Sequence, residues 1–157
     1  MLDFDLAART GIVPIPVPVS RVGDPFNSDS ATELERAFSD AVRDAAARGV
    51  RCRVLFLCNP GNPQGRCYSS STLRKLLHFC TRHGIHLVAD EIYALSQFDG
   101  DSNPFSSVLS IPGENSRTVD NMHCLYGLSK DFGLGGLRMG FIVTRNEQLR
   151  TALERIS

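Results

Sequence analysis

The sequence has no excess of charge of either sign, because 17 Lys and Arg residues balance 17 Asp and Glu residues over 157 positions. Neither sign runs in a block, so the chain lacks the basic stripe that binds nucleic acid or an anionic membrane surface. It also has no apolar run near the roughly 20 residues that a membrane helix needs. We therefore expect a small-molecule partner, with no nucleic acid and no membrane.

Signals for export, disulfide frameworks and zinc sites are missing as well. The chain begins with the acidic stretch MLDFD, where a secretory signal would be basic. Its five cysteines are odd in number and contain no CxxC pair, which argues against both a disulfide framework and a zinc site. The four histidines are scattered. We expect reduced thiols, no bound metal and a cytoplasmic location.

What is present fits a single α/β domain. A chain of 157 residues that is 42% hydrophobic can bury one core but leaves no room for a second full domain. Helical spacing of apolar residues predicts helices over residues 32–48 and 71–82, the first with the capping-box spacing of Thr32 and Glu35. Short apolar runs predict strands over residues 54–58, 85–89 and 122–126.

Alternation of these helices and strands predicts a layered fold with a mostly parallel sheet. The continuous apolar run 54–58 is typical of a strand that is buried on both faces. Residues 96–121 are rich in turn formers and are expected to form a loop with a short helix near 106–109. One more strand is expected at 140–144 and a last helix at 146–156.

Each of the three predicted parallel strands is followed by chemically reactive or polar residues. These clusters are Asn59–Pro63, Asp90–Tyr93 and Gly127–Lys130. In open α/β sheets the carboxyl ends of the strands form the edge where ligands bind. The sequence therefore predicts one shared site at this edge.

The residue sequences of these clusters resemble those of a known family. The relevant stretches are NPGNPQG at 59–65, DEIYA at 90–94, YGLSKDFGLGGLRMG at 126–140, and Arg9-Thr10-Gly11 ahead of a Val- and Pro-rich segment. They resemble the class I/II aminotransferases among the fold-type I pyridoxal phosphate enzymes, and within them most closely 1-aminocyclopropane-1-carboxylate synthase and its relatives. The resemblance implies a three-layer α/β fold. It also implies that residues 1–157 are a partial cofactor-binding large domain, without the small C-terminal domain and the N-terminal segment.

The resemblance further implies pyridoxal 5'-phosphate as the cofactor and assigns it five residues. Lys130 would form the aldimine with the cofactor and then act as the catalytic base. Asp90 would meet the pyridine nitrogen, Tyr93 and Asn62 the phenolic oxygen, and Arg138 the phosphate.

The chemistry of each side chain suits its implied role. An amine that condenses with an aldehyde must be neutral, so the pKa of Lys130 would have to fall from about 10.4 toward roughly 7 to 8. This shift requires surroundings that destabilise the charged ammonium form by about 4 kcal/mol. A carboxylate at Asp90 would keep the cofactor ring protonated and able to accept electrons. The planar fork of Arg138 matches two phosphate oxygens at once.

One position departs from the family pattern. Gly127 stands where the family usually has a serine whose hydroxyl helps to bind the phosphate. A hydrogen bond to a charged group contributes roughly 1.5 to 3 kcal/mol, so the cofactor is expected to bind tenfold or more weakly unless another group replaces it.

Three functions stay open on the sequence. The first is an aminotransferase-like enzyme, or a fragment of one, that acts on an amino acid through a Lys130 aldimine. The second is a synthase-like lyase, of the 1-aminocyclopropane-1-carboxylate synthase or carbon–sulfur lyase type. The third is a catalytically inactive, truncated homologue. A complete enzyme of this family is expected to be a homodimer, and the lack of GxGxxG after the first strand disfavours a nucleotide-binding domain.

Overall fold

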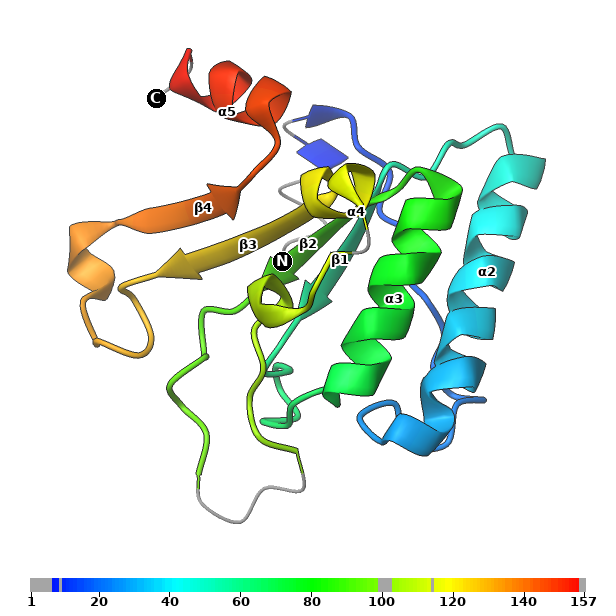
Figure 1. Cartoon of the computed structure of the whole chain (residues 1–157), viewed down its shortest axis with the longest axis horizontal. Helices are drawn as coiled ribbons and strands as arrows, with labels where there is room; N and C mark the ends of the chain where they lie inside the picture. The colour runs from blue at the N-terminus through cyan, green and yellow to red at the C-terminus, as the bar shows by residue number, and fades with distance from the viewer. Residues whose placement is uncertain (1–6, 9, 99–102, 114, 156–157) are drawn as a thin grey trace.

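A computed structural model of the chain describes residues 7–8, 10–98, 103–113 and 115–155. Its centre is a four-stranded sheet in the order β1-β2-β3-β4 (Figure 1). The strands β1 (Val54–Cys58), β2 (His86–Asp90) and β3 (Met122–Gly127) are parallel, and β4 (Gly140–Thr144) runs antiparallel to β3. The predicted α/β class with a mostly parallel sheet and flanking helices is confirmed.

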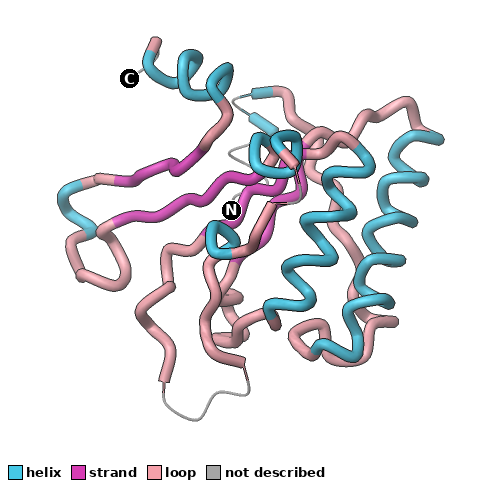
Figure 2. Tube along the Cα trace, in the orientation of Figure 1, coloured by secondary structure: helices cyan, strands magenta, loops and turns pink. Residues whose placement is uncertain are grey.

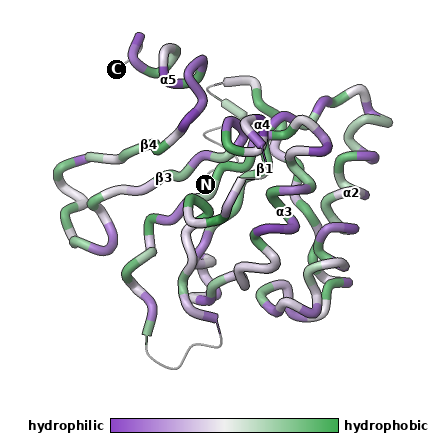
Figure 3. The backbone as a smooth tube through the Cα atoms, viewed as in Figure 1, coloured by the Kyte–Doolittle hydropathy of each residue, from purple (hydrophilic) through white to green (hydrophobic). Residues whose placement is uncertain are grey.

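The helices α2 (Ala31–Ala47) and α3 (Ser70–His83) lie side by side and form the main helical layer (Figures 1 and 2). Hydrophobic and hydrophilic residues alternate along both helices, as an amphipathic pattern requires (Figure 3). The hydrophobic ones pack on one face of the sheet. The buried core includes Leu34, Leu55, Leu57, Leu73, Leu76, Leu77 and Leu87. Each fully buried leucine contributes roughly 1.5 to 3 kcal/mol.

The ends of α3 agree with the prediction to one residue on each side. Ser69 caps the first turn by accepting a hydrogen bond from the Thr72 backbone N–H at 3.1 Å. Gly84 follows the last turn with φ of 64°, a left-handed conformation that glycine adopts without steric cost. Local chemistry therefore determines both ends of this helix.

The predicted capping box of the preceding helix is not formed. A 3-10 turn, η1 (Ser28–Ser30), leads directly into α2, so Thr32 lies inside the helix. The Thr32 hydroxyl accepts a hydrogen bond from Lys75 Nζ at 2.8 Å, and Glu35 forms an ion pair with Arg82. Both side chains of the predicted box thus connect α2 to α3.

The expectation that β1 is buried on both faces is wrong for this structure. Leu55 and Leu57 point into the core, whereas Val54 is 54% exposed and Phe56 is 40% exposed. The register places Phe56 beside Val88 on the same face. This face stays accessible because α2 and α3 pack on the opposite one, and no described residue covers Val54 and Phe56 completely.

The segment predicted as a loop contains more structure than expected. A 3-10 turn, η2 (Val108–Ser110), overlaps the expected short helix at 106–109 and begins two residues later, and α4 (Ser116–Asp120) was not predicted. The helix α5 (Glu147–Glu154) forms within the predicted range 146–156, and η3 (Gly135–Leu137) precedes β4. Within the described ranges, none of the helices has the length and apolar character needed to cross a membrane.

Candidate active site

The three polar clusters meet at the carboxyl edge of the parallel strands, as predicted. The Asn59 backbone N–H donates to the Asp90 carbonyl at 2.9 Å, and the Glu91 N–H donates to the Leu125 carbonyl at 2.9 Å. Each loop therefore starts hydrogen-bonded to the neighbouring strand. The register fixes this arrangement, because Cys58 pairs with Asp90 and Asp90 pairs with Leu125.

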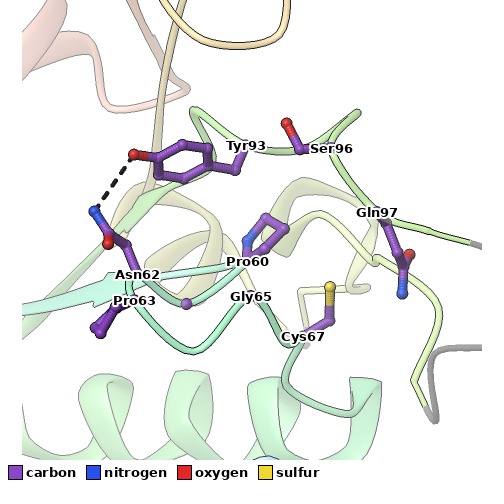
Figure 4. Close-up of a pocket in the computed structure, with 9 residues that line it drawn as sticks. Pro60, Asn62, Pro63, Gly65, Cys67, Tyr93, Ser96 and Gln97 are labelled. Carbon is purple, nitrogen blue, oxygen red and sulfur yellow. Dashed lines mark hydrogen bonds between the residues drawn. The ribbon is translucent and has the colours of Figure 1, made fainter.

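The loop after β1 is anchored by a buried side chain. The Asn59 amide is fully buried, accepts a hydrogen bond from the Tyr68 N–H at 3.0 Å and donates one to the Ser106 carbonyl at 3.2 Å. From this base the loop carries Asn62 to the surface, where its Nδ2 donates to the Tyr93 hydroxyl oxygen at 3.3 Å (Figure 4). Two of the five predicted cofactor-binding residues are thus in direct contact.

Lys130 lies beside the same tyrosine. Its Nζ atom is 5.7 Å from the centroid of the Tyr93 ring, within the range of a cation–π contact. The side chain is exposed, and the amine has no hydrogen bond or ion pair within the described residues. The Gly133 N–H donates to the Lys130 carbonyl at 3.0 Å and closes the turn that follows β3.

Asp90, the last residue of β2, is half-buried. Burial raises the pKa of its carboxyl group, and the one hydrogen bond that opposes this shift comes from the Ile92 backbone N–H at 3.2 Å. Among the described residues no cationic side chain is paired with it. A partly desolvated carboxylate of this kind favours a cationic N–H partner.

Arg138 is the predicted residue with the weakest connection to the others. Its backbone is left-handed, with φ of 53°, and its guanidinium donates to the Gly135 carbonyl at 3.2 Å within its own turn. The next residue, Met139, accepts a hydrogen bond from the Leu128 N–H at 3.3 Å, which places Arg138 across the hairpin from the end of β3. Within the described residues no contact joins its side chain to Lys130 or Asp90, so its phosphate-binding role stays a prediction.

Gly127 lies where β3 and β4 approach closely. A Cβ atom at this position would be 3.2 Å from the Met139 carbonyl oxygen. The glycine that departs from the family pattern therefore matches a tight hairpin. Arg9, which contributed to the resemblance, lies outside the described residues.

A cavity of about 190 Å³ adjoins the Asn62–Tyr93 contact. Figure 4 shows that it lies between the loop after β1 and the segment that carries Tyr93, Ser96 and Gln97. Its lining does not include Lys130, Asp90 or Arg138. The structure therefore gathers the predicted residues at one edge without enclosing all of them in one pocket.

Sequence reasoning missed Asp131, which accepts three hydrogen bonds at this edge. The donors are the Leu95 N–H at 2.9 Å, the Ser96 hydroxyl at 2.5 Å and the Tyr126 hydroxyl at 2.9 Å. The available signal was an acidic residue directly after Lys130. It also missed Glu91, whose buried carboxylate accepts from the Val108 N–H at 2.7 Å.

Comparison with known proteins agrees with this geometry. The sequence matches the family described as aminotransferase class I and II over residues 14–157. The chain belongs to this family. The match confirms the resemblance expected from the sequence motifs.

The similar proteins include more than one kind of enzyme. The chain is 35% identical to a probable aminotransferase, aclI, of Aspergillus oryzae, over 96% of this chain and 36% of that protein. It is 39% identical to 1-aminocyclopropane-1-carboxylate synthase 6 of Oryza sativa, over 99% of this chain and 27% of that protein. Among solved structures, a PLP-bound C–S lyase of Staphylococcus hominis aligns with a TM-score of 0.57 at 25% identity, over 74% of this chain and 27% of that one. The chain thus spans about a third or less of the length of these family members.

Proposed function

We propose that residues 1–157 are part of the cofactor-binding large domain of a pyridoxal phosphate-dependent enzyme that acts on an amino acid, with amino transfer as its reaction. The observation that carries this proposal is the placement of the Lys130 amine 5.7 Å from the ring of Tyr93, whose hydroxyl is bound by Asn62. The membership of the aminotransferase family and the PLP-bound structural neighbour support it.

The residues at the strand edge suit this cofactor. The exposed amine of Lys130 would hold its aldehyde covalently, and the half-buried Asp90 carboxylate would accept from its ring N–H. Arg138, which turns back on its own loop, is the proposed phosphate ligand. When bound, the cofactor supplies an electron sink for the substrate's α-carbon.

The donor and acceptor of the hydrogen bond between Asn62 and Tyr93 favour binding of the cofactor by both side chains. Asn62 Nδ2 donates to the phenolic oxygen, so the hydroxyl hydrogen of Tyr93 stays available for another acceptor. Two donors, one amide and one hydroxyl, can then face an anionic oxygen of the cofactor. Such donors stabilise negative charge on that oxygen.

Lys130 is proposed to move the proton at the substrate's α-carbon. A general base must reach the proton that it takes and must not be held by another partner. Its amine lies on a solvent-exposed turn and has no hydrogen bond within the described residues. One side chain would thus both anchor the cofactor and transfer the proton.

A lyase is the second candidate, because the similar proteins include a 1-aminocyclopropane-1-carboxylate synthase and a C–S lyase. Both chemistries begin with the same proton removal, so the products distinguish them. A keto acid formed without ammonia indicates transfer, because the amino group is retained by the cofactor. A keto acid accompanied by ammonia or sulfide indicates elimination. If no amino acid gives a product, the inactive, truncated homologue is the candidate that remains. Homodimer formation and a cytoplasmic location stay predictions.

Covalent capture of the cofactor tests the proposal sharply, because the sequence contains only two lysines, Lys75 and Lys130. We expect added pyridoxal phosphate to give a visible absorption band and, after borohydride reduction, a labelled peptide that contains Lys130. Lys130→Arg should abolish the label, whereas Lys75→Arg, on α3, should keep it. A label on Lys75, or none at all, would contradict the proposal.

A further inference from the structure

Asp131 is the most heavily hydrogen-bonded carboxylate at the strand edge. Its Oδ2 atom accepts from the Leu95 backbone N–H and from the Tyr126 hydroxyl, both at 2.9 Å. Its Oδ1 atom accepts from the Ser96 hydroxyl at 2.5 Å. The three donors come from two segments, the turn after β2 and the strand β3, separated from Asp131 by up to 36 positions.

These hydrogen bonds connect the two turns that carry the reactive groups. Asp131 directly follows Lys130, and Leu95 and Ser96 follow Tyr93 by two and three residues. The turn after β2 is closed by the Ser96 N–H, which donates to the Tyr93 carbonyl at 3.0 Å. A shift of either turn relative to the other would therefore break at least one bond to the carboxylate.

The protonation states agree with this role. Burial by itself would raise the pKa of Asp131, but the hydrogen bonds from Ser96, Leu95 and Tyr126 lower it overall. Burial and the bond to Asp131 raise the pKa of Tyr126, so the phenol keeps its proton and donates. Charge-assisted bonds of this type are roughly twice as strong as neutral ones.

We propose that Asp131 is a positioning residue, which holds the Lys130 amine against the Tyr93 ring by joining the turn after β3 to the turn after β2. The importance of this placement for catalysis rests on the proposed function, but the placement itself does not. The Lys130 amine has no hydrogen bond within the described residues, so the two turns set its position.

The presence of only two lysines makes this placement measurable without cofactor. Selective labelling of lysine Cε gives two methylene signals in an NMR spectrum, one for Lys75 and one for Lys130. The Lys130 signal should be displaced upfield by the ring current of Tyr93. Tyr93→Leu should remove this displacement and identify the signal.

Asp131→Ala is then expected to remove the displacement of the Lys130 signal and leave the Lys75 signal unchanged. Asp131→Asn, which keeps one carbonyl acceptor and loses the charge, and Ser96→Ala, which removes one donor, should give intermediate positions. Glu33→Gln is the matched control. The Glu33 carboxylate also accepts a hydrogen bond from a backbone N–H, that of Gly23 at 3.0 Å, but it is far along the chain from Lys130. An unchanged Lys130 signal in folded Asp131→Ala or Asp131→Asn would overturn the inference.

The rate of covalent cofactor capture is a second measurement, which distinguishes the positioning role of Asp131 from the proposed function. The rate of covalent capture on Lys130 should fall about tenfold to a hundredfold in Asp131→Ala, as expected for a misplaced reacting group, and stay unchanged in Glu33→Gln. A purely structural role would lower the melting temperature without changing the Lys130 signal or the capture rate, which would also overturn the inference. If the signal moves as expected but the wild-type chain captures no cofactor, the positioning role holds and the proposed function fails.

Discussion

Asn62 donates a hydrogen bond from its side-chain amide to the hydroxyl oxygen of Tyr93, 31 positions away, over 3.3 Å. The contact joins the loop after β1 to the turn after β2, so it depends on the parallel pairing of these two strands. It also leaves the Tyr93 hydroxyl hydrogen available to a ligand.

A double-mutant cycle should detect the coupling between these two residues. Asn62→Ala and Tyr93→Phe are each expected to weaken pyridoxal phosphate binding about fivefold, because each removes a hydrogen bond that contributes about 1 kcal/mol. The double variant should lose less than the sum, since neighbouring residues in one network are not additive. Spectroscopic titration measures the affinities. Fully additive losses would show that the contact is not used in binding.

Placing the family's usual serine at position 127 should lower the stability of the fold and raise the affinity for the cofactor. The new Cβ would lie 3.2 Å from the Met139 carbonyl oxygen, so Gly127→Ser should lower the free energy of unfolding by about 1 to 3 kcal/mol. Its hydroxyl should tighten pyridoxal phosphate binding up to about tenfold. Gly127→Ala adds the same Cβ without the hydroxyl and should show the stability loss alone. Equal affinities for the two variants would rule out a phosphate contact at this position.

Acid should destabilise the fold through His123. This side chain is buried on β3, with its ring nitrogens 2.8 Å from His86 Nδ1 and 2.8 Å from Thr144 Oγ1. Burial and the neighbouring His86 lower the pKa of His123 to about 4. Because an unfolded histidine binds its proton near pH 6.5, the unfolded chain takes up more protons between about pH 6.5 and about pH 4.

The free energy of unfolding should therefore be highest above pH 6.5 and fall by up to about 3 kcal/mol as the pH drops toward 4. Urea unfolding at a series of pH values measures this slope. His123→Gln should flatten it, whereas His83→Gln, at the exposed end of α3, should keep it. A slope that persists in His123→Gln would assign the effect to other groups.

The two faces of the sheet should respond differently to truncation. Leu76 on α3 is fully buried against the sheet, so Leu76→Ala should lower the free energy of unfolding by about 2 to 5 kcal/mol. Val54→Ala, on the accessible face, should cost well under half as much, because its side chain is already 54% exposed. Urea unfolding compares them. Similar losses would mean that the second face is covered in solution.

Most of the secondary structure followed from local patterns. The strand at 54–58 and the helix at 71–82 were predicted to within one residue, because apolar periodicity and the terminal Gly84 act over a few positions. The short helix α4 was missed, since five residues are too few to show a helical period. The capping box at Thr32 was wrong, because the preceding 3-10 turn starts the helix before Thr32, whose hydroxyl instead accepts a hydrogen bond from Lys75 on another helix.

The sequence by itself determined the α/β alternation, the family, and the position of reactive residues after each parallel strand, since these depend on residue order. Only the tertiary structure decided that Lys130 lies beside Tyr93, that Asp131 joins their two turns, and that Phe56 faces outward. Those relationships join residues tens of positions apart. The strand register and the side on which α2 and α3 pack bring them together, and no local pattern encodes either.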